Sequence, residues 1–363
     1  MKDIIFVVHS FDKSYIGGVL KITSDLANSL SFRGFNIKIL SLGRVYKPAF
    51  ALNENIILES LDIEKYSTQF YKGLKKFFWF KEAYKVLKPY LSQNINSIFI
   101  LSSPPLNIIF SLLKLKYSNT RMVGCDHTST SYKMNSLIGT LKFNLYNRLD
   151  KFIALTEQDN KFYLSKGIQS VYIPNFIYPI KNSYKGRAKN YLLFVGRFSL
   201  EKRPLLALEI YKKSKLWEKG IKFRMFGEGP LYDEMKNFIN RNALEEHVEI
   251  IQKVSDPNII YKDAYALIMT SSVEGFGMVL LEAISRNIPS IAFDVNYGPR
   301  TIIQHGVNGF LVEDGDLDNF NSYLYQIAWE IPEIINDSIM HFNIDNVILN
   351  WIQLFSDLEG GKL

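Results

Sequence analysis

Cysteine is nearly absent from the sequence, and long apolar runs are missing. Cys125 is the single cysteine among 363 residues, which excludes an intramolecular disulfide framework and a cysteine-built zinc site. No run of about 18 apolar residues occurs, so no membrane-spanning helix is expected. The apolar run before His9 is short, so we expect no secretory signal. These absences favour a protein of the reducing cytoplasm.

What is present is an apolar content of 47%, ample for a core, which excludes disordered and collagen-like classes. At roughly 100–200 residues per domain, the length predicts two domains. Charge is uneven: residues 1–180 hold 23 basic and 12 acidic residues, whereas residues 181–363 hold 20 and 24. The basic half therefore suits an anionic partner, which could be nucleic acid, an anionic membrane surface or a phosphorylated substrate.

Short apolar segments alternate with helical patterns in both halves, which is typical of parallel sheets. In the first half we expect strands at Ile4–Val8, Ile37–Leu40, Ser97–Leu101, Met122–Gly124, Phe152–Leu155 and Val171–Ile173. In the second half we expect them at Tyr191–Val195, Phe223–Phe226, Val248–Ile251, Ala266–Thr270 and Ile291–Phe293. Ligands of such sheets bind beyond the carboxyl ends of the strands.

The predicted fold class is α/β, with two Rossmann-like doubly wound domains facing across a cleft. Residues 1–177 form the first domain and residues 178–343 the second, joined near the linker Pro174–Asn190. A C-terminal amphipathic helix, at about 344–363, is expected to cross back to the first domain.

The strongest motif runs from Ser271 to Glu282 and follows a predicted strand. Gly275 and Gly277 allow a ligand to approach the backbone closely, and a helix begins near Met278, whose free N–H groups favour an anion. Glu274 and Glu282 are two carboxylates suited to accepting hydrogen bonds from hydroxyl groups. The alternative is a glycine turn with one surface and one helix-face glutamate, and short motifs alone do not separate these interpretations.

A second motif, Gly196–Pro204, also leaves a predicted strand and precedes a helix. Arg197 is a fork-shaped donor and Lys202 a point charge, and both suit phosphate oxygens. The alternative is a solvated charged loop. Because the Gly196–Pro204 motif lies at a strand end of the same sheet as the first motif, the binding role is favoured.

In this order and spacing, the two motifs resemble those of glycosyltransferase family 4. Glu274 and Glu282 match that family's E-x7-E motif, and Arg197 and Lys202 match its diphosphate-binding pair. Other matching positions are Gly17-Gly18, His127, Gly227-Glu228-Gly229-Pro230 and Gly306–Val312. The resemblance covers nearly all of the second half and is thin over the first.

The resemblance implies the GT-B fold and transfer of a hexose or N-acetylhexosamine from a UDP-sugar with retention of anomeric configuration. It implies no cofactor beyond the nucleotide-sugar donor and no catalytic metal. The acceptor would be a lipid-linked or oligosaccharide chain of bacterial surface polysaccharide, lipopolysaccharide O-antigen or capsule. The alternatives are a GT-B sugar-nucleotide epimerase or phosphorylase, and a catalytically silent GT-B partner protein, whose expected loss of the charged set is not seen here.

The resemblance also implies roles for single residues. Arg197 and Lys202 would stabilise the departing diphosphate, Glu282 would hold the ribose hydroxyls, and Glu274 would hold the donor sugar. Backbone and turn positions near the donor are Gly196, Gly227, Glu228, Phe276, Gly277 and Met278.

In the first domain, Gly17 and Gly18 would let a loop close on the phosphates. His127 would lie near the transferred sugar; the alternative is an ordinary strand-end histidine beside Asp126.

Residues 65–88 mix seven lysines with eight aromatic residues and contain one acid, Glu82. Such a helix suits an anionic membrane surface, and the rival interpretation is a core helix with a lysine-rich outer face. We therefore expect a cytoplasmic protein peripherally associated with the inner face of the cell membrane. No nucleic-acid recognition motif occurs, so no nucleic-acid partner is expected.

Overall fold

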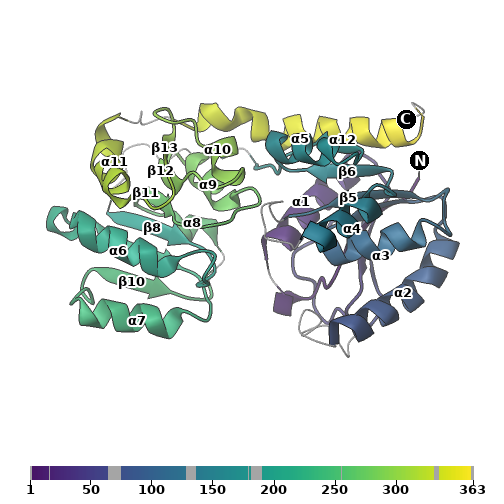
Figure 1. Cartoon of the computed structure of the whole chain (residues 1–363), viewed down its shortest axis with the longest axis horizontal. Coiled ribbons are helices and arrows are strands. Elements are labelled where there is room, and N and C mark those ends of the chain that lie inside the picture. Colours follow the sequence, from purple (N-terminus) through teal and green to yellow (C-terminus); the bar gives the residue numbers. More distant parts are fainter. Residues whose placement is uncertain are drawn as a thin grey trace. The chain divides into compact units, whose positions relative to one another are not determined.

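The computed structural model describes residues 2–15, 17–63, 75–127, 136–178, 180, 190–254, 256–330 and 335–360. Within these ranges the chain forms two compact units. The first unit contains the described residues up to Asn175 together with residues 345–360, and the second contains those from Phe176 to Ile344. Each unit has a parallel sheet with helices on both faces (Figure 1).

The sheet of the first unit has the strand order β3-β2-β1-β4-β5-β6-β7. Its strands are Ile4–Val8 (β1), Ile37–Ser41 (β2), Ile57–Ser60 (β3), Ile98–Leu101 (β4), Arg121–Cys125 (β5), Lys151–Ala154 (β6) and Ser170–Tyr172 (β7). Strand β3 was not among the predicted strands. It lies at the sheet edge with its residues exposed or half-buried, so its sequence lacks the apolar run of a central strand.

Helices cover both faces of this first sheet. They are Gly18–Phe32 (α1), Lys75–Gln93 (α2), Pro104–Leu113 (α3), Ser136–Tyr146 (α4), Glu157–Ser165 (α5) and Ile344–Leu358 (α12), with a short 3-10 turn at Lys13–Tyr15. Residues of α2, α3 and α4 share a buried core with Ile5 and Val7 of β1. On the opposite face Trp351 of α12 meets Phe6, with ring centroids 6.5 Å apart. The C-terminal helix is therefore part of the first unit's core.

The sheet of the second unit has the strand order β10-β9-β8-β11-β12-β13. Its strands are Tyr191–Val195 (β8), Lys222–Phe226 (β9), Val248–Ile251 (β10), Ala264–Met269 (β11), Ser290–Phe293 (β12) and Gly309–Val312 (β13). Strand β13 was read from the sequence only as part of a glycine turn. A Cβ atom at Gly309 would lie 2.0 Å from the Ser290 carbonyl oxygen, so glycine lets this edge strand pair closely.

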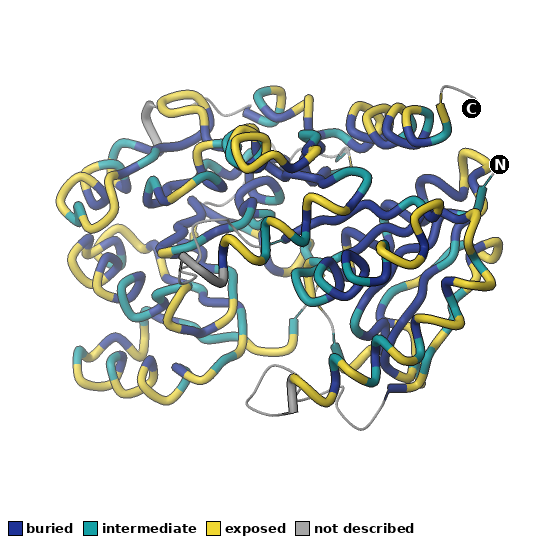
Figure 2. The backbone as a smooth tube through the Cα atoms, turned by 45° about the vertical axis from the view of Figure 1, so that its right-hand side comes forward, coloured by how far each residue is buried: buried dark blue, intermediate teal, exposed yellow. Residues whose placement is uncertain are grey.

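The helices of the second unit also lie on two faces of their sheet. They are Pro204–Ser214 (α6), Tyr232–Arg241 (α7), Pro257–Ile260 (α8), Met278–Ile284 (α9), Gly298–Ile302 (α10) and Leu317–Glu330 (α11), with 3-10 segments at Leu216–Lys219 and Asn336–Phe342. Tyr211 of α6 packs on Phe223 of β9, at a centroid distance of 5.0 Å. The central strands β11 and β12 are buried, whereas the helices expose their outer faces (Figure 2). Polar loops are thus left at the strand ends.

Candidate active site

Two charged side chains meet at the carboxyl ends of β8 and β11, which are neighbours in the second sheet. Lys202, in the loop after β8, forms an ion pair through Nζ with Oε1 of Glu274, in the loop after β11. The Ser271 hydroxyl donates a hydrogen bond of 3.0 Å to the same oxygen. The lysine side chain is 27% exposed and the glutamate 10%, so the pair is sheltered but reachable by a ligand.

The two loops that carry this pair are tied together by a residue that the sequence analysis did not single out. Arg203 donates from Nε to the Thr270 carbonyl oxygen at 2.5 Å and from Nη2 to the Ser271 carbonyl oxygen at 3.0 Å. Its backbone is left-handed, with φ of 48°, immediately before α6 begins at Pro204. These two hydrogen bonds fix the loop of Lys202 and the loop of Glu274 relative to each other. Nothing in the linear sequence distinguishes Arg203 from the other charges of its loop.

Gly196 and Gly227 bring the ends of β8 and β9 into direct contact. Gly227 has φ of 154°, and a Cβ atom on it would lie 1.9 Å from the Gly196 carbonyl oxygen. Beside it, the exposed Glu228 accepts a 2.8 Å hydrogen bond at its carbonyl oxygen from the Phe198 amide. Arg197 follows Gly196 and is exposed at the same strand end. Glycine at 227 is therefore required by packing, whatever binds nearby.

The loop after β11 leads directly into α9. Gly277 caps the helix with φ of 97°, a left-handed conformation that favours glycine, and Met278 is its first residue. Phe276 is buried, and its ring meets that of Phe342 at 5.6 Å. These contacts hold the backbone of the motif rigidly beside Glu274.

Glu282 lies on α9 and is half-buried. Its Oε2 accepts a 2.8 Å hydrogen bond from the Tyr261 hydroxyl, which comes from the end of α8. Burial and the neighbouring Glu282 charge raise the pKa of Tyr261 well above its ordinary value, so the phenol is a permanent donor near neutral pH. Tyr261 lies outside both sequence motifs, and no local signal would have found it.

His127 belongs to the first unit and follows β5 by two residues. Burial lowers its pKa from 6.5 to about 4, against the opposing effect of Asp126. The imidazole is therefore neutral near neutral pH. Asp126 itself accepts hydrogen bonds of 2.8 Å from Lys142 Nζ and from Asn107 Nδ2, and one of 3.1 Å from the Tyr146 hydroxyl.

Gly17 and Gly18 stand at the start of α1, with Gly17 as the N-cap. A Cβ atom at either position would meet no atom within 4 Å. Packing in the described part of the chain therefore gives no reason for glycine here, in contrast to Gly227.

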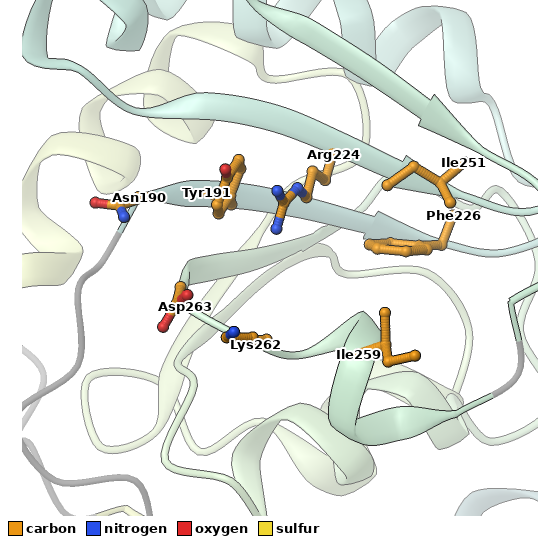
Figure 3. A pocket seen from close by; sticks show the side chains of 8 residues that line it. All are labelled: Asn190, Tyr191, Arg224, Phe226, Ile251, Ile259, Lys262 and Asp263. Atoms are coloured by element: carbon orange, nitrogen blue, oxygen red, sulfur yellow. The ribbon is translucent and has the colours of Figure 1, made fainter.

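A surface pocket of about 410 Å³ lies along the second sheet, between its strands and α8 (Figure 3). Its lining residues are Asn190, Tyr191, Arg224, Phe226, Ile251, Ile259, Lys262 and Asp263. Arg224 is already engaged there, since its guanidinium lies 3.2 Å from the Tyr191 ring centroid and Nε donates to Glu249 at 2.6 Å. The pocket contains none of the predicted site residues.

Clusters of metal-ligating side chains and membrane-spanning helices are both absent from the residues that the structure describes. Among these residues, no group of three or more His, Cys, Asp and Glu side chains is placed to hold a metal ion. Within the same ranges, no helix combines the length and apolar character needed to cross a membrane.

A family model described as glycosyl transferases group 1 matches residues 180–328. This range contains the motifs around Lys202 and Glu274. The first unit lies outside it.

Whole-chain relatives are also glycosyltransferases. An uncharacterized glycosyltransferase of Haemophilus influenzae is 25% identical, with 97% of this chain and 99% of the relative covered. The amylovoran biosynthesis glycosyltransferase AmsD of Erwinia amylovora is 28% identical, covering 86% of each chain. A Campylobacter jejuni enzyme is 22% identical, covering 99% of each chain; it is named as an α-1,4-N-acetyl-D-galactosaminyltransferase acting on a diphosphoundecaprenol-linked saccharide.

Solved structures show the same fold. Staphylococcus aureus TarM, crystallised with UDP, gives a TM-score of 0.79 at 15% identity, covering 98% of this chain and 100% of that chain. Anabaena HepE, crystallised with UDP and glucose, gives 0.75 at 16% identity, with the same coverage. The chain has the GT-B fold, and together with the family match the relatives identify it as a glycosyltransferase.

Proposed function

We propose that this glycosyltransferase moves a hexose or N-acetylhexosamine from a UDP-sugar to a lipid-linked saccharide in bacterial surface-polysaccharide synthesis, with retention of configuration. The observation that carries the proposal is the Lys202–Glu274 pair with Ser271, placed on neighbouring strand ends beside the start of α9. A cation for phosphate and a carboxylate for sugar hydroxyls stand in direct contact there.

The comparisons support the donor and acceptor classes. Two structural neighbours are crystallised with UDP, one of them with glucose as well. One relative is named for amylovoran synthesis, and another for transfer to a diphosphoundecaprenol-linked saccharide. In our proposal, this chain catalyses the same class of reaction.

In the proposed mechanism, the bond between the sugar's anomeric carbon and the diphosphate breaks as the acceptor hydroxyl attacks from the same face, and the hydroxyl's proton passes to the departing diphosphate. Arg197 and Lys202 stabilise the negative charge that develops on the diphosphate; such preorganised electrostatics is often the largest catalytic contribution. Glu274 accepts hydrogen bonds from the donor sugar, and Glu282 from the ribose. No side chain acts as a nucleophile, and no metal ion takes part.

In the structure, Lys202 is held by Glu274. Donor binding in this scheme exchanges partners: phosphate oxygens take Lys202, and sugar hydroxyls take the carboxylate. Ser271 keeps one carboxylate oxygen in place during the exchange. The roles of His127, Gly17 and Gly18 remain predictions from the family resemblance, since they belong to the first unit.

We also propose that the protein associates peripherally with the cytoplasmic face of an anionic membrane through α2. Residues 65–74 of the basic segment, and the side chains of Lys75 and Lys76, lie outside the described residues. In the described part, Phe77 is 69% exposed and Phe78 51%, whereas Trp79 is buried. Exposed phenylalanines beside Lys81 and Lys85 suit an interfacial helix.

Sedimentation with vesicles tests this membrane proposal. Vesicles containing phosphatidylglycerol should retain the wild-type protein, and the double variant Phe77→Ser/Phe78→Ser should lose that retention. Matched changes at two exposed residues elsewhere, Leu164→Ser and Ile259→Ser, should leave it intact. Equal retention of both double variants contradicts a role for α2.

Thermal-shift binding to UDP, GDP, ADP and CMP, with Mg²⁺ or with EDTA, tests the donor class. Saturation at about 100 times the dissociation constant adds about 2.7 kcal/mol to the free energy of unfolding. We expect UDP alone to stabilise the protein, equally with Mg²⁺ and EDTA. A response to no nucleotide contradicts the proposal and favours a silent partner. Release of a new sugar nucleotide without acceptor favours an epimerase.

A further inference from the structure

Tyr261 connects α8 to the second glutamate of the E-x7-E motif. It is 1% exposed, and its hydroxyl lies 2.8 Å from Glu282 Oε2. The same hydroxyl lies 3.4 Å from the Val279 carbonyl oxygen, a longer approach. The shorter of these two hydrogen bonds therefore joins the phenol to a charged side chain on a different helix.

The ring of Tyr261 is itself held in place. The Arg286 guanidinium lies 4.9 Å from the ring centroid, and Arg286 Nη1 donates a 2.9 Å hydrogen bond to the Glu282 carbonyl oxygen. Arg286 is buried along with the ring. The arrangement therefore binds both ends of Glu282, with its backbone held by Arg286 and its carboxylate by Tyr261.

A glutamate side chain that is ordered in advance binds more tightly, because it has already lost rotamer freedom. A carboxylate accepts from both hydroxyls of a diol only when its plane faces them. The phenol stays protonated near neutral pH, so its hydrogen bond holds the carboxylate plane whenever a nucleotide arrives.

We infer that Tyr261 is a positioning residue that sets the Glu282 carboxylate to recognise the ribose diol of the donor nucleotide. This inference rests on the proposed function, which gives Glu282 the ribose. It adds a residue from outside the motif and predicts that its contribution depends on the ribose hydroxyls.

The test compares the binding of UDP with that of 2′,3′-dideoxy-UDP by calorimetry. Wild-type protein should bind UDP more tightly. Because Tyr261→Phe leaves the Glu282 side chain to be ordered when the nucleotide binds, it should weaken UDP binding roughly 5- to 10-fold. It should leave 2′,3′-dideoxy-UDP binding unchanged. In a Glu282→Gln background, Tyr261→Phe should add little further loss, because the two residues act as one unit.

Tyr265→Phe is the matched control. Tyr265 is also buried, and its hydroxyl donates a 2.7 Å hydrogen bond to the Leu324 carbonyl oxygen. Both variants lose one buried hydrogen bond and should lose a similar amount of stability. Only Tyr261→Phe should change the ratio of UDP to dideoxy-UDP affinity.

An unchanged ratio in Tyr261→Phe overturns the inference, and then Tyr261 has a structural role alone. An equal loss of affinity for both nucleotides is one form of this outcome, because it leaves the ratio unchanged. If wild-type protein binds UDP and 2′,3′-dideoxy-UDP equally, the ribose role of Glu282 is wrong while nucleotide binding stands. If wild-type protein binds neither nucleotide, the proposed function and this inference fail together.

Discussion

Each unit contains a lysine–carboxylate pair at a strand end, and the two pairs differ in what surrounds them. In the first unit, Asp126 is paired with Lys142, with side chains 2% and 12% exposed. In the second, Glu274 is paired with Lys202, at 10% and 27% exposed. Asn107, Tyr146 and Tyr163 also donate hydrogen bonds to the first carboxylate, whereas Ser271 also donates to the second.

The difference separates a structural ion pair from one suited to binding. A buried carboxylate surrounded by donors has no capacity left for a ligand, and removing its partner leaves an uncompensated buried charge. A partly exposed pair at a glycine-rich loop can exchange partners with a ligand at lower cost. A lysine–carboxylate pair thus supports folding at one strand end, and a second such pair supports catalysis at the other in our proposal.

The largest expected effect is on the exposed pair. Lys202→Met should lower the transfer rate about 10²- to 10³-fold, because a preorganised charge facing the leaving diphosphate is lost. The free energy of unfolding should change little. Initial rates and urea unfolding check both parts. Lys212→Met is the control and should keep full activity. It removes an exposed lysine of α6 whose Nζ donates a hydrogen bond to Asn242. Full activity in Lys202→Met would show that this lysine is not part of the active site.

The next effect tests the buried pair. Lys142→Met should lower the free energy of unfolding by about 3–5 kcal/mol, because Asp126 stays buried without its cation. Urea unfolding measures this. Lys213→Met, from an exposed pair with Asp318, should shift the midpoint little. Similar unfolding midpoints for the two variants would show that the buried pair is not the structural one.

Two glycines sharpen the comparison further. Gly227→Ala should cost about 1–3 kcal/mol, because its Cβ would overlap the Gly196 carbonyl oxygen. Gly18→Ala meets no neighbouring atom and should leave thermal stability unchanged or slightly higher. If Gly18→Ala keeps its stability but loses transfer activity, a ligand approaches that loop. Retained activity would argue against the phosphate role of Gly18.

The last predicted effect is a pH dependence of the first unit's stability. The pKa of His127 falls from 6.5 to about 4 on folding, so between these values the unfolded chain binds more protons. Stability is therefore complete above pH 6.5 and declines as the pH drops toward 4, by at most about 1.4 kcal/mol per pH unit. Urea unfolding across this window should show that the free energy of unfolding changes less steeply with pH in His127→Gln than in the wild-type protein. An identical slope would show that His127 is not the titrating group.

Much of this architecture was readable from the sequence, because central strands of parallel sheets are continuous apolar runs. The predicted segments at Ile4–Val8 and Tyr191–Val195 coincide with the central strands β1 and β8, and the segment at Val248–Ile251 coincides with the edge strand β10. Two other edge strands were missed: β3 because its residues are exposed or half-buried, and β13 because it begins at Gly309 in a glycine-bearing segment that suggests a turn. Of the row Phe77–Phe80, two residues are exposed and Trp79 is buried, as one helix face dictates.

The sequence by itself determined which residue types stand at strand ends: Lys202 and Glu274 on glycine-bearing loops, and His127 after an apolar strand. Their partners were decided by the tertiary structure alone. Strand order makes β8 and β11 neighbours although 68 residues separate Lys202 from Thr270, and so Lys202 meets Glu274. Helix packing brings Tyr261 to Glu282 and Lys142 to Asp126. Such pairings depend on distances in the folded chain, and a linear motif contains no record of them.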